Sequence, residues 1–247
     1  MKKIKLITAV LVFFAAFNLT SCDNEPIDPA IDLNNGGNTG GGGTSSGDYW
    51  PAALNNQWVF NLNGVQQDPL KMVSINAING NTYYTFNHQT GTGGTGTATS
   101  ATLRLRKTNG DYYIKVEDIV TPAQAGMPGS TTTGSETILL KDYLAVGGTW
   151  TSSYNQTTTY TDPSFPVITL NFVIEASIME KNISLTVNGA VYTDVIKVKY
   201  VQNVTSFGQT SSSINYYWFS KNVGPIKITN EFGTDTYNQE LVSYILN

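Results

Sequence analysis

Cysteine and histidine are nearly absent from this 247-residue chain, which has one of each. A structural zinc site usually needs four Cys or His ligands, so the composition excludes one. A single cysteine cannot form an internal disulfide. Charged residues are also few, at 13%, so few side chains are available for acid–base chemistry or phosphate binding. Hydrophobic residues at 40% and aromatic residues at 11% are still enough to build a folded core.

The N-terminal apolar segment is too short for a transmembrane helix. Three lysines within the first five residues precede an apolar stretch from Leu6 to Phe17, which only Thr8 interrupts. The stretch has about 12 residues, whereas a helix needs roughly 20 to span a bilayer. A basic start, a short apolar run and small residues after it are typical of an export signal. We therefore predict a signal peptide over residues 1–21.

The end of this segment resembles the lipobox of bacterial lipoproteins. Leu19 matches its apolar position, Ser21 its small position and Cys22 its cysteine. The resemblance implies cleavage before Cys22, followed by lipidation of its sulfur and of the new amino terminus. Acyl chains would then anchor the protein, because each buried CH₂ contributes about 0.8 kcal/mol. The alternative is a plain secretory signal with an incidental cysteine.

Residues 22–47 are predicted to be a disordered tether behind the lipidated cysteine. Acidic residues come first, and a run of Gly, Asn, Ser and Thr follows. A flexible linker of this length reaches roughly 25–30 Å. The start Cys22-Asp23-Asn24-Glu25 resembles the signal that exports lipoproteins of Bacteroidota to the outer cell surface. If it is only a solvated spacer, the lipoprotein faces the periplasm.

The net charge becomes more negative when the signal is removed. The signal holds three of the 14 basic residues and no acidic residue, so the mature chain has 11 basic and 18 acidic residues and a charge of −7. This sign disfavours nucleic acid, whose recognition needs a basic surface. It also disfavours peripheral attachment to anionic lipid heads. Contact with the membrane is therefore expected only through the N-terminal lipid.

Residues 48–247 have the pattern of an all-β domain. Apolar and polar residues alternate over 167–180, 191–202 and 73–77, which is the period of a strand with one buried face. Asn-Gly pairs at Asn79, Asn109 and Asn188 separate such runs and indicate tight hairpins. We found no stretch of helical periodicity. The prediction is a curled antiparallel sheet or half-barrel of roughly a dozen strands, with surface loops at 91–100 and 121–135.

The domain contains a weak internal repeat. The segment from Pro51 to Trp58 is similar to that from Tyr143 to Trp150, since each is a short turn that ends in a Trp. Two similar halves, over 50–140 and 142–247, would explain this. Coincidence among common turn sequences explains it equally well.

Residues that could carry out catalysis are scarce. His88 stands alone, and we interpret it as a rim residue hydrogen-bonded to a loop. No Ser lies in a Gly-x-Ser-x-Gly nucleophile elbow. Glu117 and Asp118 are adjacent, so on a strand they point to opposite faces and cannot flank one bond. We predict that the chain is not an enzyme and that it uses no cofactor and no metal.

Aromatic residues are the remaining candidates for a binding site. The run Tyr216, Tyr217, Trp218 and Phe219 places rings on both faces of one strand, and Trp50 stands just after the tether. Such rings could stack on a sugar or line a groove for an apolar ligand. Alternatively, the strand is buried on both sides or closes the edge of the sheet.

The domain also resembles a loosely defined group of uncharacterised cell-envelope lipoproteins of Bacteroidota. The opening turn from Pro51 to Trp58 and the closing hairpin from Trp218 to Gly224 carry the resemblance, although Ala53 and Asn55 depart from the usual pattern. It implies a curled antiparallel sheet in the cell envelope and no particular activity. We expect an outer-membrane lipoprotein, on the cell surface, that binds glycan, peptide or lipid. The alternative is a structural or accessory subunit of an outer-membrane complex, with an envelope protein as partner.

Overall fold

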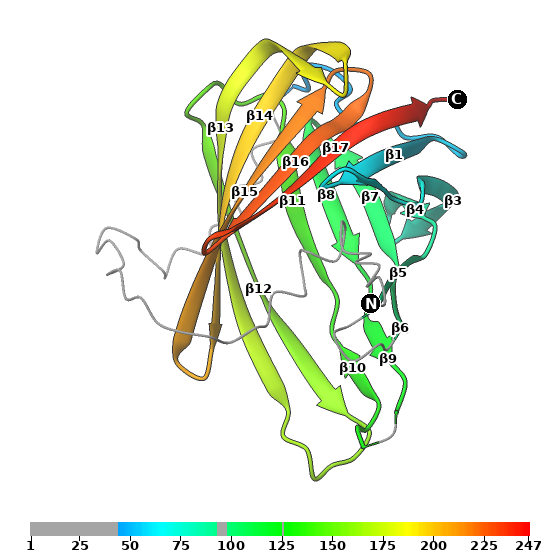
Figure 1. Cartoon of the computed structure of the whole chain (residues 1–247), viewed down its shortest axis with the longest axis vertical. Helices are drawn as coiled ribbons and strands as arrows, with labels where there is room; N and C mark the ends of the chain where they lie inside the picture. Colours follow the sequence, from blue (N-terminus) through cyan, green and yellow to red (C-terminus); the bar gives the residue numbers. More distant parts are fainter. Residues whose placement is uncertain (1–43, 93–97, 125) are drawn as a thin grey trace.

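The structure is a computed structural model, and it describes residues 44–92, 98–124 and 126–247. The predicted signal peptide, Cys22 and most of the predicted tether lie outside these residues. The described chain is all-β and antiparallel, as predicted. It curls around one apolar interior, with the long strands β13 to β16 on one side and β3, β4, β7 and β8 on the other (Figure 1).

The described residues form 17 strands. Their bounds are β1 Gln57–Leu62, β2 Val65–Gln66, β3 Leu70–Ile78, β4 Asn81–Phe86, β5 Gln89–Thr92, β6 Ala98–Ala101, β7 Leu103–Thr108, β8 Asp111–Val116, β9 Ile119–Thr121, β10 Ser130–Thr132, β11 Ser135–Lys141, β12 Thr149–Tyr160, β13 Ile168–Val187, β14 Ala190–Ser206, β15 Gln209–Ser220, β16 Gly224–Phe232 and β17 Asp235–Ile245. Only one or two residues separate β4 from β5, β6 from β7, β8 from β9 and β10 from β11. Each of these pairs can be counted as one interrupted strand. Counted in this way, the number of strands is close to the dozen expected from the sequence.

The strands pair mainly with their neighbours in sequence. Strands β12 to β17 form a continuous meander, and β1 pairs with β17, so the first strand lies beside the last. The sheet continues from β1 through β3, β4, β7 and β8 to β11. At the other end of the molecule β10 pairs with both β9 and β12. The long and short strands therefore share one curled sheet.

The predicted alternation is confirmed on the two longest strands. On β13, Phe172, Ile174, Ala176 and Ile178 are buried, while the residues between them are half-buried or exposed. On β14 the same pattern runs through Val198 and its neighbours. A period of two brings every second side chain to the same face, and here that face lines the interior.

The Asn-Gly turns are confirmed as well. At all three, Asn79, Asn109 and Asn188 and the glycines that follow them have positive φ, between 46° and 85°. Both central residues of a type I′ turn need positive φ, and this turn matches the twist of an antiparallel hairpin.

Two other predictions from the sequence were wrong. The segments 91–100 and 121–135 contribute to β5, β6 and β10 and are not simply loops. Val73 and Ile75, predicted to be buried, are each 48% exposed. A register shift between Met72 and Ser74 interrupts the alternation, and β4 pairs with β7 only at two residues, so this end of the β3–β4 hairpin has little cover.

The two tryptophans of the weak repeat are both buried in the interior. The Trp58 indole donates a hydrogen bond to the Val223 carbonyl at 2.7 Å, and the Trp150 indole donates one to the Ile138 carbonyl at 3.1 Å. The Trp58 ring therefore ties β1 to the turn between β15 and β16, and the Trp150 ring ties β12 to the neighbouring strand β11. A buried indole N–H usually finds such a partner.

The first described residues are fastened to the sheet. Ser45 donates a hydrogen bond to the Asp142 carboxylate at 2.6 Å, and the Ser46 amide donates another at 2.9 Å. Tyr112 donates to the Gly47 carbonyl at 2.9 Å. Contacts with the sheet thus begin a few residues before position 48. They fix the direction in which the chain enters the interior, where Trp50 lies.

Candidate ligand-binding pocket

The interior contains a pocket between the two sides of the curled sheet. Its cavity volume is about 90 Å³. Pockets for small ligands are typically larger, at about 300–1,000 Å³. The residues that line it come from strands on both sides, and most are aliphatic or aromatic, among them Phe60, Leu62, Leu103, Ile114, Leu139 and Ile228. The space is therefore shaped for an apolar ligand.

Trp50, Phe86 and Phe219 form an aromatic wall of the pocket. The centroid of the Trp50 ring is 5.8 Å from that of Phe86 and 6.2 Å from that of Phe219. Gly224 makes room for this wall, because a Cβ there would lie 3.3 Å from Trp50 Cδ1 and 3.0 Å from Trp58 Nε1. Its φ of 113° is also one that other residues rarely adopt.

The aromatic run of β15 divides between the two faces of the sheet. Tyr217 and Phe219 are buried, line the pocket and stack with their centroids 6.1 Å apart. Tyr216 and Trp218 are half-buried on the other face. Of the five aromatic residues predicted from the sequence, the structure therefore brings Trp50, Tyr217 and Phe219 to the pocket and leaves the other two outside it.

The outward ring of Trp218 lies in a row of charged residues. Lys197 and Lys227 are its direct neighbours on β14 and β16, and their ammonium groups lie 5.3 and 5.8 Å from the indole. Lys197 donates to Glu180 at 3.1 Å, and Lys227 donates to Glu240 at 2.7 Å. The order across five strands is thus acid, cation, indole, cation and acid. We call these five residues the outer row.

Some polar side chains interrupt the apolar lining of the pocket. Asn230 donates a hydrogen bond to the side-chain oxygen of Asn215, and Gln239 is buried nearby on β17. Of the described residues that line the pocket, none is charged. Any charged group inside it would therefore lack an ionic partner.

Three buried polar atoms of lining residues have no hydrogen-bond partner among the residues that the structure describes. They are Trp50 Nε1, Thr137 Oγ1 and Tyr154 OH. The Ser135 hydroxyl lies beside Tyr154 and acts to lower its pKa, but no hydrogen bond of normal geometry joins the two groups. Buried polar groups are nearly always satisfied in proteins, so these three are exceptions.

Burial controls the ionisation of the tyrosines around the pocket. It raises the pKa of Tyr154 to about 12. It also raises the pKa of Tyr217, and a negative charge on the neighbouring Tyr154 would raise it further. Both phenols are therefore neutral at physiological pH, when they can donate or accept hydrogen bonds.

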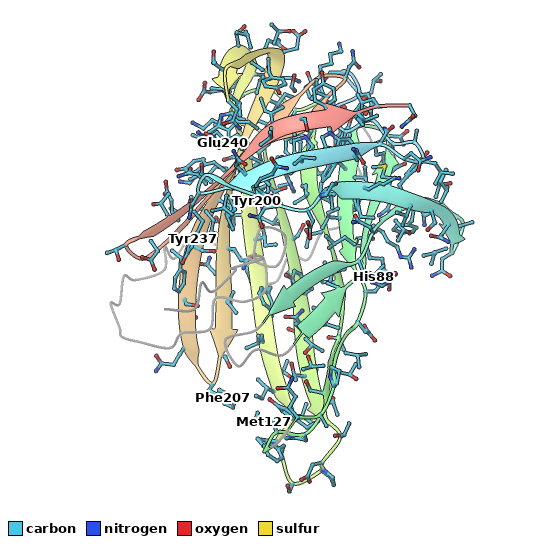
Figure 2. All side chains as sticks on the ribbon, turned by 45° about the vertical axis from the view of Figure 1, so that its right-hand side comes forward. His88, Met127, Tyr200, Phe207, Tyr237 and Glu240 are labelled. Carbon is cyan, nitrogen blue, oxygen red and sulfur yellow. The ribbon has the colours of Figure 1, made fainter. Side chains whose placement is uncertain are left out.

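The residues considered for catalysis lie apart from the pocket. His88 is exposed, and its Nδ1 is 3.5 Å from the Thr102 hydroxyl (Figure 2). Glu117 pairs with Arg104 at 2.6 Å, while Asp118 accepts a hydrogen bond from the Gly134 amide. Within the described residues, no group of three or more His, Cys, Asp or Glu side chains could hold a metal ion.

Sequence reasoning missed Thr137 and Tyr154. Thr137 lies near the polar start of β11, and Tyr154 lies on β12, which is rich in Thr and Ser. A usable signal was present in β12, since Tyr154 is the only aromatic residue between Trp150 and Tyr160 in an otherwise polar strand. A lone ring in such a strand predicts the face that turns inward.

No protein-family model matches the chain, and no curated protein matches it. Its fold is similar to that of two solved structures. One is a protein from Parabacteroides distasonis, classed provisionally as a lipoprotein, with a TM-score of 0.54 and 13% identity over 81% of this chain and 99% of that one. The other is a protein from Bacteroides fragilis, classed provisionally as exported and with a YmcC-like fold, with a TM-score of 0.49 and 10% identity over 81% of this chain and 100% of that one. At these identities the first likeness shows a shared curled β fold.

The described residues contain no helix that is long and apolar enough to cross a membrane.

Proposed function

We propose that this protein is a lipid-anchored envelope lipoprotein whose curled sheet binds the apolar chain of a lipid. The interior pocket carries this proposal, because its lining is mostly aliphatic and aromatic, as in sites for apolar ligands. Of the ligands expected from the sequence, a glycan or a polar peptide would need more hydrogen-bonding groups than the lining offers. The outward rings of Tyr216 and Trp218 lie beside lysine side chains, which makes them poor platforms for stacking sugars.

The proposed binding can be tested with N-phenyl-1-naphthylamine, a dye that fluoresces in apolar surroundings. We expect the full chain to bind the dye in the pocket. Ile228→Trp, which fills part of the pocket, should weaken binding at least about tenfold by occupying the space. Lys227→Gln lies next to it on the opposite face of β16 and is the matched control. Equal binding by the wild type and Ile228→Trp would contradict the proposal.

Anchoring through Cys22 to the outer membrane, with the domain at the cell surface, is the second part of the proposal. The lipobox-like residues support it, as does the provisional class of the Parabacteroides distasonis protein. Growth with labelled palmitate should label the wild type and not Cys22→Ser. Protease added to intact cells should then degrade the domain; survival of the domain would place it on the periplasmic side.

An accessory role in an envelope complex is the other function, and one feature favours it. Phe207, at the turn between β14 and β15, is 85% exposed, and Met127 is exposed at the same end of the molecule (Figure 2). Exposed apolar side chains at one end could contact a partner protein. Cross-linking in cells would test this role: a specific partner that is lost on Phe207→Ser supports it, and an unchanged monomer excludes it.

A further inference from the structure

Trp50 differs from the rest of the pocket lining in how the backbone holds it. Of the described residues that line the pocket, every one except Trp50 belongs to a strand. A residue in a strand is held by the backbone hydrogen bonds of its ladder. Trp50 lies before β1, in a segment over residues 45–50 that we call the strap, and the strap forms no strand. Trp50 is therefore the lining residue that can leave the pocket without breaking a ladder.

Polar contacts fasten the first half of the strap to the sheet. The Ser45 hydroxyl and the amide of the next residue donate to the Asp142 carboxylate. The Tyr112 hydroxyl accepts a hydrogen bond from the Tyr49 amide at 2.8 Å and donates one to the Gly47 carbonyl at 2.9 Å. One phenol on β8 thus holds two points of the strap.

Lys107 fastens the second half of the strap. Its ammonium lies 2.9 Å from both carboxylate oxygens of Asp48 and donates to the Trp50 carbonyl at 3.0 Å. The Asn222 amide adds one bond, to the Asp48 carbonyl. The side chains of Lys107 and Asp48 are 26% and 42% exposed, so water can replace their contacts when the strap moves. These contacts can therefore break and form again.

The apolar side of the strap occupies space in the interior. Trp50 is only 5% exposed and packs against Phe86 and Phe219. With this ring in place the cavity volume is about 90 Å³, well below the roughly 300 Å³ at which pockets for small ligands begin. Room for an acyl chain has to come from the displacement of a lining group. A chain that takes the place of the Trp50 ring also replaces its apolar contacts.

We propose that the strap is a latch that gates the pocket, and that Lys107 and Tyr112 are positioning residues that hold it shut through Trp50. This inference rests on the proposed function, because it assumes that the pocket receives an apolar chain. In the latched protein the Trp50 ring fills part of the interior. In the released protein the interior has room for the ligand, so the ligand binds the released form. The apparent affinity then depends on the fraction of molecules in which the strap is released.

Variants that weaken the latch test this gating without changing the pocket lining. We expect Lys107→Met and Tyr112→Phe, in the full chain carrying Cys22→Ser, each to bind N-phenyl-1-naphthylamine about two- to tenfold more tightly, because more molecules are released. Lys115→Met is the matched control, since Lys115 is also 26% exposed and also pairs with a carboxylate, away from the strap. It should leave the affinity unchanged. Unchanged or weaker binding by both latch variants would overturn the inference.

Removal of the ring shows whether Lys107 acts through Trp50. Trp50→Ala should bind the dye more tightly than the wild type, because no ring has to leave. Lys107→Met added to Trp50→Ala should then give no further gain, since residues that act through one another are not additive. A gain as large as in the wild type would mean that Lys107 acts by another route, and weaker binding by Trp50→Ala would make the ring a ligand contact. Either result overturns the inference.

Stopped-flow mixing measures the gate itself and depends only on the mild Lys107 substitution. If release precedes binding, the observed rate for the wild type should level off as the dye concentration rises. Lys107→Met should raise that plateau about twofold or more, an effect that a general loss of stability does not produce. Rates that increase linearly and equally in both proteins would overturn the inference. A dye that no variant binds, Trp50→Ala included, would instead contradict the proposed function.

Discussion

The two faces of β15 carry two aromatic rings each, but the rings have different surroundings. On the inner face, Tyr217 and Phe219 stack beside Trp50 and border empty space. On the outer face, Trp218 is flanked by two lysines, each of which is itself paired with a glutamate. Each charged side chain of the outer row is paired with another residue of the row. The inner face instead borders a pocket whose lining residues include unsatisfied polar atoms.

This difference shows what distinguishes a binding surface from a structural one in this molecule. Residue type does not, because both faces of β15 have the same kinds of ring. The surroundings of the rings do, since the outer rings lie beside lysine side chains and the inner ones border the pocket.

The largest effect is expected when the two faces of β15 are truncated in turn. Phe219 is fully buried, so Phe219→Ala should lower the free energy of unfolding by about 3–5 kcal/mol. Trp218→Ala removes a half-buried ring and two cation–π contacts and should cost about 1–2 kcal/mol. Urea denaturation of both variants measures the difference. Equal losses would mean that the outer row is as important for the core as the inner wall.

Alkaline pH should destabilise the inner face next. Below pH 10 both the folded and the unfolded protein hold Tyr154 neutral, and its contribution to stability is fully present. As the pH rises from 10 towards about 12, the unfolded phenol ionises first, so this contribution is lost. The loss is up to about 2.7 kcal/mol, two pH units at about 1.36 kcal/mol each.

The measurement is urea unfolding at pH 9, 10 and 11 for the wild type and for Tyr154→Phe. The variant should lose less stability over this range, because one of the buried phenols is gone. Absorbance at 295 nm reports the ionisation of the folded protein directly. Parallel pH profiles for the two proteins would show that Tyr154 does not contribute.

Much of this fold could be predicted from the sequence, because alternation and Asn-Gly turns act over short distances. Phe172 and Val198 face inward as their periodicity indicates, and the turn at Asn188 forms as expected. The face of β3 could not be predicted, since a register shift after Met72 depends on how β3 meets β4.

The candidate pocket could be predicted only in part, because it also depends on how strands meet in the folded sheet. The β15 run reveals that rings occupy both faces, but which pair faces inward depends on the curl of the whole sheet. Thr137 and Tyr154 become pocket residues only because β11 and β12 come together in the folded sheet. The absence of a partner for a buried hydroxyl is a property of packing in three dimensions, and no local sequence pattern encodes it.

A smaller effect of opposite sign is expected for the unpartnered hydroxyls. Without ligand, Thr137→Val and Tyr154→Phe remove buried groups that lack hydrogen bonds, so each should raise the free energy of unfolding by about 0.5–1.5 kcal/mol. Thermal denaturation of the ligand-free variants measures this. A loss of stability would mean that the hydroxyls already have partners, such as ordered water.

The smallest effect is expected at the ends of the outer row. Glu180→Gln and Glu240→Gln each remove one half of a partly exposed ion pair, and ion pairs near the surface contribute about 0–1 kcal/mol. Because salt screens exposed charges, the difference from the wild type should vanish at about 1 M NaCl. Dye binding should stay unchanged in both variants, since the row faces away from the pocket. If either substitution weakened dye binding, the outer row and the pocket would be coupled through β15, and the two faces could no longer be treated as separate.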